Sequence, residues 1–146
     1  DDMLDVRPCK NIHDIFVCGR KFANLTNKPI HLSLLIKMPL IFLEKKANSR
    51  NYVEAFFKEN GYDLSPEFEL GSHDLLLQFA KINLGIACVT KEFAEEEIGR
   101  GELFEIPLVT PIPKRSIGIV TLKKVPISHA AKKFITLIDP RALNNL

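Results

Sequence analysis

The sequence contains no tryptophan and only three cysteines among its 146 residues. Cys9, Cys18 and Cys88 form no CxxC pair, and two of them lie in apolar runs where a small hydrophobic side chain fits. Closely spaced thiols are the usual sign of a zinc site or a redox motif. We therefore expect reduced, structural cysteines, no metal and no cofactor, which is typical of a cytosolic protein.

Long apolar runs are also absent. No stretch approaches the roughly 18 consecutive apolar residues that a membrane helix requires. The first ten residues, DDMLDVRPCK, have no apolar core after a basic flank, so we expect no signal peptide. The 20 basic and 18 acidic residues leave a formal net charge of only +2. This balance produces no strong basic field, and we expect that the chain itself does not bind DNA.

Catalytic signatures are missing as well, since no GxSxG, HExxH or Walker sequence occurs. Glu67 and Glu69 could resemble a carboxylate pair, but their alternation with apolar residues is typical of a solvated strand face. Cys88 with His73 could form a nucleophile and base, but the apolar run GIACV disfavours a thiolate. We predict that the protein is not an enzyme.

What the sequence does contain is a regular alternation of strand and helix patterns. Apolar or alternating runs predict strands at 15–18, 38–44, 67–70 and 86–89. Apolar spacing of three and four residues predicts helices at 48–60 and 72–83, with Asn48 or Ser49 capping the first and Ser72 capping the second. The turn-rich stretch KFANLTNKPIH is expected to be a loop. The alternation predicts an α/β fold with a mainly parallel sheet covered by helices.

Two predicted helices begin just after predicted strands, at Ser49 and at Ser72. In open sheets of this kind, ligands bind beyond the carboxyl ends of the strands. Free N–H groups and a partial positive charge at a helix start stabilise a carboxylate or phosphate. Lys45, Lys46 and Arg50 oppose the dipole of the first helix, which a negative ligand would compensate. Equally, the lysines could be solvated loop residues and the serines plain caps.

Four stretches follow one another in a distinctive order: MPLIFLEKKANSRNYVEAFFKENGY, then PEFELGSHDLLLQFAKINLGIACVTKEFAEEEIGRGELFEIPL, then KRSIGIVTLKK and ISHAAKKFITLI. Together they resemble the effector-binding domain of the LysR-type transcriptional regulators, over nearly the whole chain from about residue 4. The resemblance implies the α/β fold of type 2 periplasmic binding proteins. In this fold two Rossmann-like lobes are joined by crossover strands, and a small effector binds between the lobes.

The resemblance also implies a domain organisation. Residues 1–40 and 122–146 would form a partial first lobe, and residues 41–121 the second lobe. The DNA-binding helix-turn-helix and the opening half of the first lobe are expected to be absent. The function implied is small-molecule sensing in the bacterial cytoplasm, with an anionic effector controlling DNA binding and transcription through the absent domain. The alternative is a free-standing solute-binding protein of the same fold.

The family's two pocket positions fall on the starts of the two helices noted above. The expected effector-binding residues are Lys46, Asn48, Ser49, Gly71, Ser72 and His73. A histidine at this place can tune the charge of a ligand near neutral pH, although many histidines at a first helical turn are simply exposed.

Three consecutive leucines, Leu75 to Leu77, span about 200° of a helix surface, which is more than one buried stripe needs. Because the family pairs its sensor domains, we expect Leu76 and Leu77 to form a dimer contact in a homodimer or homotetramer. A single leucine left in water would also be unremarkable.

Overall fold

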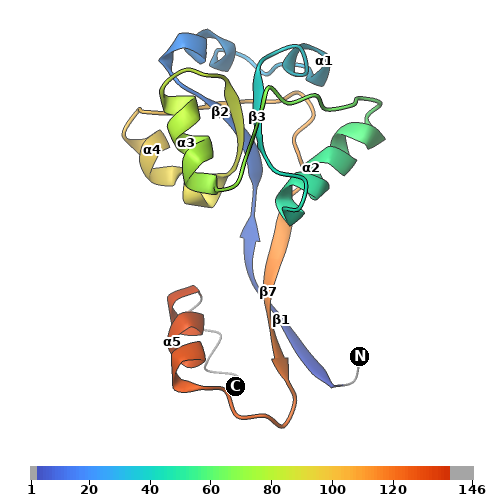
Figure 1. Ribbon diagram of the computed structural model, residues 1–146, viewed down its shortest axis with the longest axis vertical. Coiled ribbons are helices and arrows are strands. Elements are labelled where there is room, and N and C mark those ends of the chain that lie inside the picture. The colour runs from blue at the N-terminus through green and yellow to red at the C-terminus, as the bar shows by residue number, and fades with distance from the viewer. Residues whose placement is uncertain (1–2, 139–146) are drawn as a thin grey trace. The chain divides into compact units, whose positions relative to one another are not determined.

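The computed structural model describes residues 3–138, without the side chains of Pro8, Cys9 and Ile138. The chain divides into two compact units, residues 1–12 with 114–146, and residues 13–113 (Figure 1). The sequence analysis had assigned residues 13–40 to the first lobe, but the structure places them in the second unit. The reason is that residues 14–18 form an inner strand of that unit's sheet. Residues 139–146 of the predicted first lobe lie outside the described residues.

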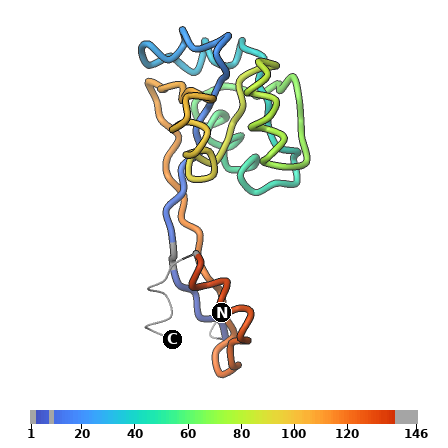
Figure 2. Tube along the Cα trace, turned by 90° about the vertical axis from the view of Figure 1, so that its left-hand side faces the viewer, coloured from blue at the N-terminus to red at the C-terminus, as the bar shows by residue number. Residues whose placement is uncertain are grey.

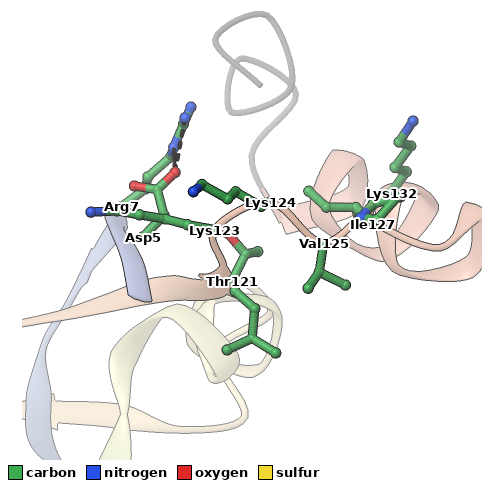
Figure 3. Close-up of a pocket in the computed structure, with 10 residues that line it drawn as sticks. Asp5, Arg7, Thr121, Lys123, Lys124, Val125, Ile127 and Lys132 are labelled. Carbon is green, nitrogen blue, oxygen red and sulfur yellow. Dashed lines mark hydrogen bonds and ion pairs between the residues drawn. The ribbon is translucent and has the colours of Figure 1, made fainter. Parts of the chain in front are cut away.

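The first unit contains a two-stranded ribbon and one helix. Strand β1 (Leu4–Ile12) pairs antiparallel with β7 (Arg115–Leu122), and the two strands run side by side in Figure 2. Helix α5 (His129–Ile138) follows after a short connection (Figure 3), and Ser128 Oγ accepts a hydrogen bond from the Ala131 N–H at 3.1 Å. The sequence analysis did not predict β1, because its polar residues and proline obscure the alternation that marks a strand.

The second unit is built on a five-stranded sheet in the order β4-β3-β5-β2-β6. Its strands are β2 (Asp14–Cys18), β3 (Leu40–Leu43), β4 (Phe68–Leu70), β5 (Ile86–Thr90) and β6 (Phe104–Ile106). Strand β3 is parallel to both β4 and β5, whereas β2 is antiparallel to both β5 and β6. Four strands therefore point the same way, which confirms the prediction of a mainly parallel sheet, and β2 is the exception.

Helices cover both faces of this sheet because neighbouring strand residues point to opposite sides. Its helical segments are η1 (Arg20–Thr26), α1 (Leu32–Leu35), α2 (Asn48–Glu59), α3 (His73–Lys81), η2 (Lys91–Phe93) and α4 (Glu95–Gly99). Phe16 and Phe42 share a core with Phe57 of α2, and the Phe16 ring packs edge-on against the other two at 5.8 and 6.0 Å. Val17 and Ile41 share a second core with α3. Helices α2 and α3 therefore lie on opposite faces.

Two local predictions were wrong. The stretch expected to be a loop contains the 3-10 helix η1, which begins with a hydrogen bond from the Phe22 N–H to the Gly19 carbonyl at 3.2 Å. Phe22 and Leu25 of η1 pack against the core. The turn-forming residues around them made the stretch resemble a loop, so this packing was not predicted. Helix α2 is preceded by Ala47 as its cap residue, so neither Asn48 nor Ser49 caps it. Within the described chain, no helix has both the length and the apolar character needed to cross a bilayer.

Gly85 allows β3 and β5 to approach each other closely, and its replacement tests this packing. A Cβ at residue 85 would overlap the Pro39 carbonyl oxygen and press on Ile41. This carbonyl accepts the hydrogen bond from the Ile86 N–H at 2.8 Å, so the clash would also disturb the parallel pairing. We predict that Gly85→Ala lowers the free energy of unfolding by about 1–3 kcal/mol in urea denaturation.

Gly99→Ala is the matched control, because a Cβ there meets no atom within 4 Å. It should leave the free energy of unfolding unchanged or raise it slightly, as alanine favours a helix. Equal losses for the two variants would contradict the close approach at Gly85.

Candidate functional site

The carboxyl ends of three parallel strands meet at one edge of the sheet in the second unit. Leu43 at the end of β3 pairs with Leu70 at the end of β4, and the Glu44 N–H donates to the Leu70 carbonyl at 3.0 Å. Strand β5 ends at the same edge, at Thr90. Helix α2 begins five residues after β3, and α3 begins three residues after β4. The starts of both helices are therefore brought to this edge, as the sequence predicted.

The start of α3 is capped, and its first residue turns toward the sheet. Ser72 Oγ accepts a hydrogen bond from the Leu75 N–H at 3.3 Å, while Gly71 and Ser72 remain exposed. The half-buried His73 accepts a hydrogen bond at Nε2 from the Thr90 N–H at 3.0 Å. An Nε2 that accepts a proton donor must carry a lone pair, so the neutral ring holds its proton on Nδ1. His73 thus ties α3 to the end of β5.

The ionisation of His73 follows from this position. Burial lowers the pKa of His73 below the ordinary value of 6.5, although the nearby carboxylates of Asp74 and Glu97 act in the opposite direction. The hydrogen bond from Thr90 further requires the neutral ring. At neutral pH, His73 is therefore an uncharged residue whose Nδ1–H is a hydrogen-bond donor.

The start of α2 contributes residues of two kinds. Lys46 and Asn48 are exposed, Ser49 is half-buried, and the cap residue Ala47 offers no side-chain acceptor to the first N–H groups. Arg50, in contrast, has a side chain that is only 1% exposed. The helix start thus presents a polar surface with a buried cation beneath it.

Arg50 is held by contacts to three elements of the second unit. Its Nη1 donates to the Leu43 carbonyl at 3.0 Å and lies 3.6 Å from Glu69 Oε1 of β4. Its Nε lies 3.3 Å from Glu54 Oε2, and the guanidinium lies over the Phe42 ring at 5.2 Å. Arg50 therefore joins the ends of β3 and β4 to α2, and its charge is partly neutralised by two half-exposed carboxylates.

A small cavity lies between the two helix starts. It has a volume of about 10 Å³ and is lined by Asp14, Phe42, Leu43, Ser49, Arg50, His73, Cys88, Val89 and Thr90. Such a space holds about one water molecule and no organic ligand. Of the six expected effector-binding residues, Ser49 and His73 line this cavity, and Lys46, Asn48, Gly71 and Ser72 do not. These four residues lie on the exposed side of the same edge.

The sequence analysis missed Asp14 and Thr90 as residues of this edge, and it treated Arg50 only as a charge opposing the helix dipole. Asp14 and Thr90 are both buried, and they pair across β2 and β5. The signal available in the sequence was a polar residue beside an apolar run, because Asp14 precedes the run 15–18 and Thr90 follows the run 86–89. Without the antiparallel position of β2, nothing in the sequence placed Asp14 beside the helix starts.

Other chemistry is limited among the described residues. No group of three or more histidine, cysteine or acidic residues is placed to hold a metal ion. Cys18 and Cys88 are buried, and burial raises the pKa of the Cys18 thiol to about 11. A thiol with so high a pKa is a poor nucleophile at neutral pH. The Cys9 side chain lies outside what the structure describes.

Comparison with known proteins identifies the family of this fold. The family model described as the LysR substrate binding domain matches residues 1–142. The chain belongs to this family. Its curated relatives include the HTH-type transcriptional regulator YeiE of Escherichia coli (strain K12), which is 23% identical over 127 residues, covering 87% of this chain and 43% of YeiE. This LysR domain thus spans less than half the length of that relative.

A second curated relative is the HTH-type transcriptional activator CmpR of Synechocystis sp. (strain ATCC 27184 / PCC 6803 / Kazusa). It is 30% identical over 76 residues, covering 52% of this chain and 25% of CmpR. Together with YeiE, it is named as a regulator of transcription. The match of the family model to residues 1–142 confirms the family predicted from the sequence.

Solved structures of LysR regulators share the fold. The regulatory domain of CcmR from Synechocystis PCC6803, solved in complex with 2-PG, superposes with a TM-score of 0.79 at 20% identity, covering 97% of this chain and 68% of CcmR. The effector binding domain of QuiR, solved in complex with shikimate, gives a TM-score of 0.75 at 15% identity, covering 100% of this chain and 68% of QuiR. The predicted type 2 periplasmic-binding-protein-like fold is confirmed.

The predicted dimer contact does not fit the burial of the leucines in this LysR domain. Leu76 and Leu77 are 0% and 5% exposed and pack in the core between α3 and the sheet. These two side chains are therefore too buried to contact a second subunit. Leu75, which is 44% exposed, is the member of the triplet that faces solvent.

Removal of the Arg50 guanidinium tests whether it holds the edge together. We predict that Arg50→Met lowers the free energy of unfolding by about 2–3 kcal/mol, because the Leu43 carbonyl and two carboxylates lose their partner. Glu54→Gln, which keeps a polar group at a half-exposed position, should cost less than about 1 kcal/mol. Urea denaturation measures both variants. Equal effects would show that Arg50 contributes no more than one surface ion pair.

The lowered pKa of His73 predicts a pH dependence of stability. Because the unfolded chain takes up this proton more readily than the folded chain, the free energy of unfolding should fall as the pH drops through 6.5 and toward the lower folded-state pKa. His73→Gln should remove this component between pH 7.5 and 5.5, with His31→Gln, at an exposed position, as control. Parallel stability curves for the wild type and His73→Gln would contradict the assignment.

Proposed function

We propose that this chain is the ligand-sensing part of a LysR-type transcriptional regulator and that it binds a small anionic effector at the edge formed by the starts of α2 and α3. The observation that carries the proposal is the convergence of these two helix starts above the buried guanidinium of Arg50. Family membership supports the sensing role. The named ligands of the CcmR and QuiR structures, 2-PG and shikimate, support a small molecule as the effector.

The groups at the edge favour a negative ligand because they are mainly hydrogen-bond donors. The uncapped N–H groups of α2 and the Ser49 hydroxyl face this side, and Lys46 is close in sequence. His73 adds an Nδ1–H donor in its neutral form. Donors and a helix dipole of this kind stabilise a carboxylate or phosphate. The cavity below them is too small for such a ligand, so the effector would lie on its outer side, against Asn48, Ser49, Gly71 and Ser72.

The consequences for the full-length protein are part of the same proposal. An effector that prefers one arrangement of the protein shifts its population by no more than the difference in affinity. The names of YeiE and CmpR support a DNA-binding helix-turn-helix domain outside this chain. Self-association and a bacterial cytoplasmic location belong to the same proposal, and membership of the LysR family supports them. The same names favour regulation over the alternative of a free-standing solute-binding protein.

A binding screen on the full-length protein tests the proposal. We expect one or more members of a panel of small carboxylic and phosphorylated acids, including shikimate, to raise the free energy of unfolding by about 2.7 kcal/mol at 100 times the Kd. Ser49→Ala should weaken binding of that acid about tenfold, because one hydrogen bond to a charged group is lost. Calorimetry measures the affinity.

Ser33→Ala, at an exposed position of α1, is the matched control and should leave the affinity unchanged. The site assignment fails if both serine variants weaken binding equally. The anionic preference fails if only neutral compounds bind.

A further inference from the structure

The sequence contains a single Asn–Gly pair, Asn60 and Gly61, which lies where helix α2 ends. In such a pair the backbone nitrogen of glycine can attack the asparagine side chain, because glycine has no Cβ to hinder the approach. The attack converts asparagine to aspartate or isoaspartate without an enzyme. Both residues are exposed in the second unit. The end of α2 is therefore a place where the chain can modify itself.

The way α2 ends requires glycine at residue 61. Asn60 is the cap residue after the helix, and Gly61 adopts a φ of +87°. The Gly61 N–H donates to the Lys58 carbonyl at 3.0 Å. The Tyr62 N–H donates to the Phe57 carbonyl at 2.9 Å. These two bonds and the left-handed glycine form a Schellman motif, a common helix ending in which any other residue would be strained.

The same motif keeps the two reactive groups apart. A five-membered ring forms only when the Gly61 nitrogen lies beside Asn60 Cβ about the Cα–C bond. The ψ of Asn60 is 6°, which places this nitrogen beside the Asn60 backbone nitrogen instead. The Gly61 N–H is also held by the Lys58 carbonyl, and Asn60 Nδ2 donates to the Phe56 carbonyl at 2.8 Å. Attack therefore requires the Schellman motif to open.

We propose that Asn60 is a modification site, which converts to aspartate or isoaspartate when the end of α2 opens. The Gly61 nitrogen forms a bond to Asn60 Cγ, the Cγ–Nδ2 bond breaks, and the Gly61 proton leaves with Nδ2 as ammonia. Water then opens the resulting imide. Cleavage of the bond to Cγ gives aspartate, and cleavage at the main-chain carbonyl gives isoaspartate. The reaction uses none of the residues of the candidate effector site, so it does not depend on the function proposed above.

The products cannot restore the contacts that the asparagine makes. Nδ2 donates to the Phe56 carbonyl, whereas a carboxylate only accepts and would face both this carbonyl and the negative end of the helix dipole. Isoaspartate adds one carbon to the main chain, which shifts the N–H groups of Gly61 and Tyr62 away from their acceptors. Phe57, in the last turn of α2, is 0% exposed and packs against Phe16 in the core. Modification thus holds the end of α2 open and weakens the packing beneath it.

Peptide mass spectrometry of the full-length protein tests the site. Trypsin cleaves after Lys58 and Lys81 and releases residues 59–81, in which Asn60 is the only asparagine. We expect this peptide to be modified at least about tenfold more slowly in native buffer than in guanidinium chloride, because the motif must first open. Both aspartate and isoaspartate should be detected, since the imide has two carbonyls.

Asn51 is the internal control, because it is exposed in the same helix and is followed by Tyr52. Trypsin releases it in residues 51–58, and it should remain unmodified in both conditions. Equal rates for Asn60 in native buffer and denaturant would overturn control by the fold. Absence of modification at Asn60 in both conditions would overturn the site itself.

A matched pair of variants at Tyr62 tests the motif without changing the reactive pair. Tyr62→Pro removes the N–H that donates to the Phe57 carbonyl, whereas Tyr62→Ala removes the same side chain and keeps this N–H. In native buffer Asn60 should convert several-fold faster in Tyr62→Pro than in Tyr62→Ala. In guanidinium chloride the two variants should react at the same rate. Equal rates in native buffer would contradict control by the motif, and the wild-type comparison decides the question if Tyr62→Pro does not fold.

Discussion

The arrangement of the second unit depends on the parallel pairing of β3 with both β4 and β5. Parallel strands must be joined by crossover connections, and here the connections carry α2 and α3. Because each helix starts within a few residues of a strand end, parallel pairing alone brings both starts to one edge of the sheet. The close contact of Gly85 with the Pro39 carbonyl keeps β3 and β5 in this register. The candidate effector site is thus a consequence of strand direction.

Two side chains, the buried Arg50 and the half-buried His73, then hold the edge in a fixed arrangement. Arg50 binds the ends of β3 and β4 to α2, and His73 binds α3 to the end of β5. A free guanidinium could bind a ligand directly, but one that lies between Glu54 and Glu69 acts mainly by positioning the helix start and by its field. Groups held before the ligand arrives lose less entropy on binding, which favours a preorganised site. The outer residues are free to make the contacts.

Local patterns in the sequence were enough to predict most elements of the second unit, but not the contacts between them. The apolar spacing of α2 and the run that forms β5 depend on neighbours in the chain, and both were predicted correctly. The position of β2 between β5 and β6, and with it the role of Asp14, depends on residues at least 70 positions away. Leu76 and Leu77 appeared available for a partner because three adjacent leucines exceed one helical stripe, yet two of them fit the core.

The distribution of charge illustrates the same limit at the scale of the whole chain. A net charge of +2 excludes a strong field only if the charges are mixed evenly, and in this protein they are sorted between two units. Residues 1–12 with 114–146 contain nine basic and four acidic residues, whereas residues 13–113 contain eleven basic and fourteen acidic residues. The sorting could be read from the sequence only after the structure joined residues 1–12 to residues beyond 113 through the β1–β7 ribbon. Electrostatic attraction acts over about a Debye length, roughly 8 Å at physiological salt, so a binding partner responds to the charges within that distance and not to the total. Topology therefore has to be known before composition can indicate what a protein binds.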